Sequence, residues 1–180
     1  MERSLAYVAL FAALIAVLGL VPQITLISGV PITAQSLGVM LAGTVLGARR
    51  GALAVLLFLL LVAIGLPLLS GGRGGLGVFA GPTVGFLIGF PIAAYVAGLV
   101  VERWSVRLGL AALVGAFLGG IVVLYAFGIV GMSVVLGKTL PEAALLVTPF
   151  VPGDLIKVGL TALLTSALAR VRPGALLSRP

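Results

Sequence analysis

An acid and a base lie three residues apart in an otherwise apolar part of the chain, at Asp154 and Lys157. Residues three apart are neighbours on a helix, so a helix here brings the two charges together. If this segment crosses a membrane, the charges are costly there and predict a ligand site. A carboxylate accepts hydrogen bonds and an ammonium group donates them, so the pair suits a ligand with N–H groups beside a carbonyl. The structural alternative is that Asp154 caps the helix and Lys157 neutralises it.

The glycine-rich run GGRGG at residues 71–75 is a second candidate site, with Arg73 between Gly72 and Gly74. Glycines let a backbone approach a ligand closely and expose N–H groups that can form an anion-binding nest. The run is not a P-loop, because the Lys-Ser/Thr ending is missing and no strand precedes it. A flexible turn with a surface arginine is an equally good interpretation of the motif alone.

The sequence PITAQS at residues 31–36 precedes a short apolar segment. If this stretch is extended, Thr33 and Gln35 lie on one face and can both reach a pocket. Helix capping by Thr33 or Ser36 explains each hydroxyl more simply. Capping does not explain Gln35, which stays a candidate binding residue.

The composition places these residues in a membrane protein, since 62% of the chain is hydrophobic and 8% is charged. Eleven basic residues against four acidic ones would suggest nucleic acid in a soluble protein. Here the basic residues flank apolar segments, so membrane topology explains them and we expect no nucleic-acid partner. The chain has no cysteine, no histidine and a single aspartate. We therefore expect no metal site, no cofactor and no catalytic residues.

Charged and Gly/Pro-rich stretches divide the chain into six apolar segments. Arg49 and Arg50 separate the short second and third segments and favour a tight hairpin whose turn lies at the membrane surface. The glycine-rich fifth segment predicts tilt, close packing or a break. The predicted fold is a single all-α transmembrane domain over residues 1–180, a six-helix bundle. Its helices are expected at residues 5–21, 35–48, 51–66, 81–101, 108–136 and 149–169.

The basic residues also predict the orientation. With the N-terminus in the cytoplasm, eight of the eleven fall on the cytoplasmic side, which favours both termini inside and an even number of spans. Three longer connections, residues 22–34, 67–80 and 137–148, then lie outside. Irregular backbone at membrane depth is tolerated where it lines a cavity, so these connections predict an outward-facing pocket with a lid.

Small residues recur along the first segment at spacings of three and four. Such a stripe lets helices approach closely in lipid. It packs within the bundle or docks another subunit. The residues of the stripe are Ala6, Ala9, Ala13 and Ala16, with Ala12 beside them.

Three stretches, in this order, resemble the BioY family, the biotin-binding S components of energy-coupling-factor (ECF) transporters. They are VPITAQSLG at residues 30–38, the glycine-rich region at residues 65–86 and PGDLIK at residues 152–157. With the six-segment layout, the resemblance covers nearly the whole chain. One departure is Phe86, where the family pattern has tyrosine, so no hydroxyl contact is expected at this position.

The resemblance implies a six-helix protein of a prokaryotic cell membrane that binds biotin with high affinity from the outer side. It implies the role of substrate-capture subunit in ATP-driven vitamin uptake, not that of an enzyme. The implied partners are a transmembrane coupling protein (EcfT-like) and two cytoplasmic ATPases. Ala9 and Ala13, with Ala12 and Ala16, match the family's contact with the coupling protein.

Biotin itself suits the candidate residues. Its cyclic urea matches Asp154 and Lys157, its carboxylate suits the loop around Arg73, and its apolar bicycle suits aromatic walls. A stand-alone biotin carrier and an S component for another small vitamin remain as alternatives. The predicted substrate-binding residues are Asp154, Lys157, Gln35, Thr33, Arg73, Gly72, Gly74, Phe79 and Tyr125.

Overall fold

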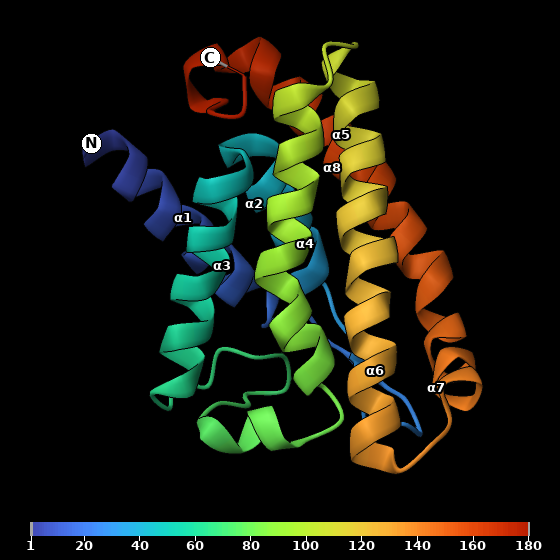
Figure 1. Ribbon diagram of the computed structural model, residues 1–180. Helices are drawn as coiled ribbons and strands as arrows, with labels where there is room; N and C mark the ends of the chain where they lie inside the picture. The colour runs from blue at the N-terminus through green and yellow to red at the C-terminus, as the bar shows by residue number, and fades with distance from the viewer. Residues whose placement is uncertain (1, 180) are drawn as a thin grey trace.

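The computed structural model describes residues 2–179 and folds most of them into helices. Within this range the helices make six successive passes through one bundle, which confirms the predicted fold class (Figure 1). Three stretches, Val84–Arg103, Leu108–Leu136 and Leu140–Val171, are long and apolar enough to cross a membrane. The helices of the six passes are α1 (Glu2–Leu18), α2 (Gln35–Leu46), α3 (Ala48–Ala63), α4 (Val84–Arg103), α5 (Leu108–Phe117) continued through the π-helical η2 (Leu118–Val123) into α6 (Leu124–Leu136), and α7 (Leu140–Val147) followed by α8 (Val151–Val171).

The predicted hairpin between the second and third segments is present, and a single glycine makes its turn. Gly47 has a φ of +88°, in the left-handed region that favours glycine. α3 starts three residues earlier than predicted, so Arg49 and Arg50 lie in its first turn. Both arginines are exposed, as expected for a turn at a membrane surface.

α4 is the central helix and packs against α2, α3, α5 and α6. Glycines bring these helices close: a Cβ at Gly119 would lie 2.3 Å from the carbonyl oxygen of Ala93, and one at Gly85 would lie 2.1 Å from that of Phe127. The glycine-rich fifth segment thus packs closely, as predicted. It is also interrupted by one π-helical stretch, a rare irregularity that occurs mostly inside α-helices.

The third long connection was expected to be irregular, and this expectation is wrong. It contains α7, which begins after Thr139 in the sequence Thr-Leu-Pro-Glu. The backbone N–H of Thr139 donates to the Glu142 carboxylate at 2.8 Å, half of a capping box that satisfies an otherwise free helix-end donor. A short 3₁₀ turn, η3 (Thr148–Phe150), then joins α7 to α8.

The other two long connections also contain short regular elements. The first forms a two-stranded antiparallel ribbon from β1 (Ile24–Thr25) and β2 (Pro31–Ile32), in which Ile24 pairs with Ile32. The second contains the 3₁₀ helix η1 (Leu76–Ala80). With α7, these elements gather at one end of the bundle, which we call the loop end (Figure 1).

Both ends of the described chain lie at the opposite end of the bundle, which we call the basic end (Figure 1). The Arg3 guanidinium donates to the carbonyl of Gly174 at 2.5 Å, beside the final turn η4 (Pro173–Ala175). Arg179 donates to the carbonyls of Val101 and Val106. The two termini therefore share one end, as an even number of passes requires.

Candidate functional site

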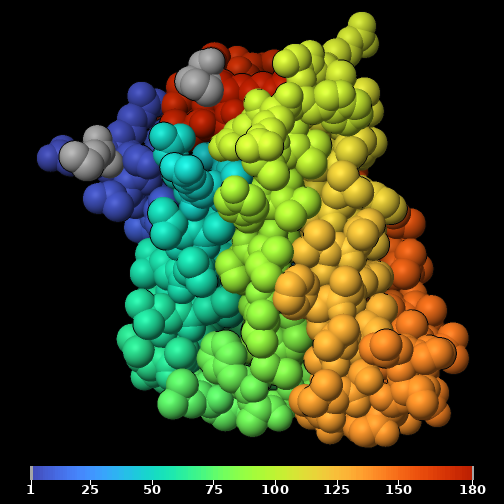
Figure 2. Space-filling model, viewed as in Figure 1, coloured from blue at the N-terminus to red at the C-terminus, as the bar shows by residue number. Residues whose placement is uncertain are grey.

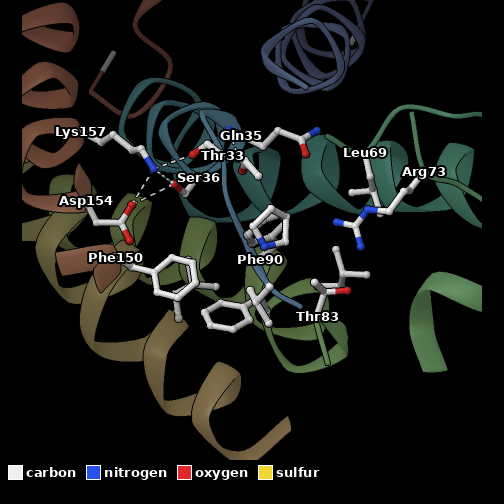
Figure 3. A pocket seen from close by; sticks show the side chains of 15 residues that line it. Thr33, Gln35, Ser36, Leu69, Arg73, Thr83, Phe90, Phe150, Asp154 and Lys157 are labelled. Carbon is white, nitrogen blue, oxygen red and sulfur yellow. Dashed lines mark hydrogen bonds and ion pairs between the residues drawn. The ribbon is translucent and has the colours of Figure 1, made fainter. Parts of the chain in front are cut away.

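A pocket at the loop end is enclosed by α2, α4, α8 and the first two connections (Figure 3). Its cavity measures about 60 Å³. Polar groups and aromatic rings share the lining, the usual composition of a small-molecule site. The lining residues are Val30, Pro31, Thr33, Gln35, Ser36, Leu69, Arg73, Thr83, Phe86, Leu87, Phe90, Leu124, Phe150, Asp154 and Lys157.

The acid and the base that begin α8 form an ion pair in this pocket. Lys157 Nζ lies 2.8 Å from Asp154 Oδ1, and the exposed fractions of the two side chains are 14% and 6%. Lys157 also donates to the carbonyl of Thr33 at 2.6 Å. The predicted meeting of the two side chains on one helix face is therefore confirmed. Buried charges that are paired and hydrogen-bonded avoid most of the cost of leaving water.

Ser36 on α2 completes this charged group. Its hydroxyl accepts a hydrogen bond from Lys157 Nζ at 2.9 Å and can donate to Asp154 Oδ1 at 3.2 Å (Figure 3). The sequence alone suggests this serine as a helix cap, but α2 has no side-chain cap at its N-terminus. Its part in the pocket was missed, since only the packing of α2 against α8 brings it to the ion pair.

Tyr125 lies behind the carboxylate instead of in the pocket wall. Its hydroxyl donates to Asp154 Oδ2 at 2.7 Å, and the ring is buried. The second carboxylate oxygen is thus held from the side of α6. The predicted contact of Tyr125 with an apolar ligand is replaced by a supporting role for Asp154.

Arg73 faces the cavity from the side opposite the ion pair (Figure 3). Its Nε donates to the carbonyl of Ser70 at 3.2 Å. Its two terminal nitrogens have no hydrogen-bond partner among residues 2–179. A planar guanidinium group with free donors suits a carboxylate, which it can bind through two hydrogen bonds.

The glycines beside Arg73 shape a turn, in which the N–H of Arg73 donates to the carbonyl of Leu69 at 3.2 Å. The N–H of Gly72 donates to the carbonyl of Leu69 at 3.0 Å, so it is not free for an anion. Gly74 packs against Leu66, where a Cβ would lie 2.2 Å from the carbonyl oxygen. Neither glycine lines the cavity.

Gln35 lines the cavity, but its amide is occupied by the protein. Nε2 donates to the carbonyls of Ile15 at 3.1 Å and Leu68 at 3.0 Å, and Oε1 accepts the N–H of Ser70 at 3.1 Å. The side chain therefore ties α1 and the second connection to α2. Thr33 is held similarly, because its hydroxyl accepts the backbone N–H of Gln35 at 3.3 Å.

Three phenylalanines form the aromatic wall. The sequence drew attention only to Phe86, as a departure from the family's tyrosine, and not to Phe90 or Phe150. Phe86 and Phe90 lie one turn apart on α4, and Phe150 approaches from η3 with its ring centroid 5.9 Å from that of Phe86. Phe79, which was expected in the wall, lies in η1 and is partly buried against the core outside the cavity lining. The i, i+4 spacing of Phe86 and Phe90 was the available signal.

The alanine stripe of α1 is split by the packing of the bundle. Ala6, Ala9 and Ala13 are exposed and Ala16 is half-buried. Ala12 is only 2% exposed and faces the core, so it leaves no surface for a partner. A stripe of exposed small residues nevertheless remains along α1.

The fold and the pocket together define a class, a small helical membrane protein with a polar and aromatic pocket at one end of its bundle. The model of the BioY family matches residues 2–174. The chain belongs to the BioY family.

Known relatives match over nearly the whole chain. The biotin transporter BioY of Rhodobacter capsulatus is 58% identical to it, over 99% of this chain and 100% of its own length. The biotin transporter BioY of Rhizobium etli is 56% identical, over 92% of each. The crystal structure of the S component for biotin from an ECF-type ABC transporter matches with a TM-score of 0.89 and 31% identity, covering 94% of this chain and 92% of its own.

Proposed function

We propose that this protein binds biotin in the loop-end pocket as the substrate-capture S component of an ECF uptake transporter. The observation that carries the proposal is the placement of two polar groups on opposite sides of one cavity. Asp154, Lys157 and Ser36 lie on one side and Arg73 on the other (Figure 3). The names of the relatives and of the matching crystal structure support biotin as the ligand.

Biotin has two polar ends that match these two groups. Its cyclic urea offers N–H donors to the Asp154 carboxylate, and its carbonyl can replace the carbonyl of Thr33 as an acceptor for Lys157, whose three N–H groups are all bonded within the protein in this structure. Its valerate carboxylate meets the free guanidinium nitrogens of Arg73. The apolar bicycle lies against the wall that contains Phe86. The ligand is thus recognised at both ends and along its middle.

The cavity must enlarge to admit this ligand. A volume of about 60 Å³ has room for only a few water molecules. We infer that the first and second connections move outward as biotin enters. The second connection is tied to α2 by the hydrogen bonds of the Gln35 amide with Leu68 and Ser70, and the first by the Thr33 hydroxyl, which accepts the N–H of Gln35.

A calorimetric titration of the purified protein tests the ligand. We expect one biotin bound per chain, with riboflavin and thiamine giving no heat above dilution. The Asp154→Asn variant, which removes one charge while keeping the shape, should lose the biotin signal. Binding of another vitamin in place of biotin, or unchanged affinity in the variant, would overturn the proposal.

The basic end faces the cytoplasm of a prokaryotic cell, so the pocket opens outward.

A transmembrane coupling protein contacts the exposed Ala9 and Ala13, and two cytoplasmic ATPases supply the energy. An Ala9→Trp or Ala13→Trp change should spare biotin binding and block co-purification with the coupling protein, whereas Leu163→Trp on the exposed face of α8 should not. Uptake into vesicles that lack the ATPases would favour a stand-alone carrier instead.

A further inference from the structure

A second pocket lies at the basic end, between the α2–α3 turn and the end of α4. Its volume is about 360 Å³, and three arginines and one glutamate contribute to its lining. Beside the pocket, Gly98 lets α4 pack closely against the start of α3, because a Cβ there would lie 2.4 Å from the backbone nitrogen of Ala48. Its lining includes Arg49, Arg50, Tyr95, Leu99, Glu102 and Arg103.

The positive charge of this pocket is largely unbalanced. The lining holds three arginines and one carboxylate, Glu102, which offsets one of the three positive charges and accepts the N–H of Ala48 at 2.9 Å. Arg50 donates to the carbonyl of Leu177 at 3.3 Å. Arg49 and Arg103 make no hydrogen bond and no ion pair within residues 2–179, so both guanidinium groups are free. Free arginines around one hollow favour an anion with several oxygen acceptors.

Below the arginines the surface is apolar. On α4, Tyr95 and Ile92 are exposed in successive turns, and on α3 Leu53 and Leu56 are exposed in the same way. α3 and α4 lie side by side on one face of the molecule (Figure 2). A tyrosine between an apolar surface and basic residues is typical of a membrane interface.

We propose that this basic pocket binds the phosphate headgroup of an anionic phospholipid, whose acyl chains lie along α3 and α4. The free guanidinium groups of Arg49 and Arg103 hold the phosphate, and the exposed Leu53 and Ile92 contact the chains. A soluble phosphate would use the arginines alone, whereas a lipid uses both surfaces. Basic pockets between membrane helices bind anionic headgroups by the same chemistry.

Native mass spectrometry of the detergent-purified protein with phosphatidylglycerol and phosphatidylcholine tests the proposal. The wild type should prefer phosphatidylglycerol, and R49A/R103A should weaken its binding by about 30-fold. R170A/R172A is the matched control, since it removes two exposed arginines at the end of α8, outside the pocket. It should change the binding by less than about twofold. R49Q/R103Q repeats the test should the alanine variant not purify as a monodisperse helical protein.

Three results would overturn the proposal. One is an absence of preference between the two lipids. Another is an equal loss of phosphatidylglycerol binding in R49A/R103A and R170A/R172A, which would show a general effect of positive charge at the basic end. The third is displacement of phosphatidylglycerol by inorganic phosphate at a similar concentration, which identifies a soluble phosphate site. Resistance of the wild-type complex to inorganic phosphate supports the lipid.

Discussion

The two pockets lie at opposite ends of one bundle and use charge in opposite ways. At the loop end, the partly buried Lys157 and the buried Asp154 neutralise each other, and Ser36 and Tyr125 hold the carboxylate. At the basic end, Arg49 and Arg103 are exposed and unpaired within residues 2–179. A buried, hydrogen-bonded pair fixes the positions of donors and acceptors and can select one ligand shape. Exposed free charges attract any suitable anion and are screened by salt, so only the basic end should bind its ligand in a strongly salt-dependent way.

Removing one charge of the buried pair has the largest expected effect. In Lys157→Ala, the carboxylate of Asp154 stays buried without its cation, so unfolding free energy should fall by about 3–5 kcal/mol. Biotin affinity should fall more than about 100-fold, as expected when a buried charged partner is lost. Thermal unfolding and calorimetry measure the two quantities.

The neutral double variant D154N/K157Q separates stability from binding. It should recover most of the stability, because no charge is left unpaired, and should still not bind biotin. Preference for phosphatidylglycerol should be unchanged in both variants, since the basic end is untouched. Recovery of biotin affinity in the double variant would show that the pair is structural.

Arg73→Ala should have the next largest effect, and only on ligands with a free carboxylate. Loss of charged hydrogen bonds should weaken biotin about 10- to 100-fold and leave the biotin methyl ester nearly unchanged. Lys138→Ala is the control, since it removes an exposed basic residue outside the pocket lining at the loop end. If Arg73→Ala weakened biotin and its methyl ester equally, the carboxylate of biotin would not be bound by Arg73.

Ser36→Ala should weaken biotin by about tenfold, because it removes the hydroxyl that contacts both Lys157 and Asp154. Ser166→Ala provides a matched control: this hydroxyl donates within α8 to the carbonyl of Ala162, far from the pocket lining. Competition with labelled biotin measures both variants. If Ser36→Ala bound biotin as tightly as Ser166→Ala does, Ser36 would not belong to the binding site.

Glu102→Gln should have the smallest effect, a change in lipid preference at the basic end of the bundle. Removing the only carboxylate of the basic pocket should raise the preference for phosphatidylglycerol about fivefold. The amide oxygen can still accept the N–H of Ala48, so stability should change by less than about 1 kcal/mol. Biotin affinity should not change. A lowered lipid preference would mean that Glu102 itself holds the headgroup.

Much of the fold and part of the candidate site could be predicted because they follow from local spacing. The i, i+3 relation of Asp154 and Lys157 and the arginines of the hairpin act within one or two turns. α7 was missed although its signal is local, because the Thr139 to Glu142 capping box was not recognised. Phe79 was predicted in the pocket wall but lies outside the cavity lining. The local sequence does not show in which direction the side chains of a 3₁₀ turn point.

The sequence by itself determined the six apolar passes, the concentration of arginines at one end and the meeting of Asp154 with Lys157, because helix periodicity and hydrophobicity act over short stretches. Only the tertiary structure decided what surrounds that pair. Ser36 reaches Asp154 across 118 residues of sequence, and Phe86 and Phe90 enter the same pocket because glycines let α4 pack closely against its neighbours. Such contacts depend on the relative placement of whole helices, which no single segment specifies.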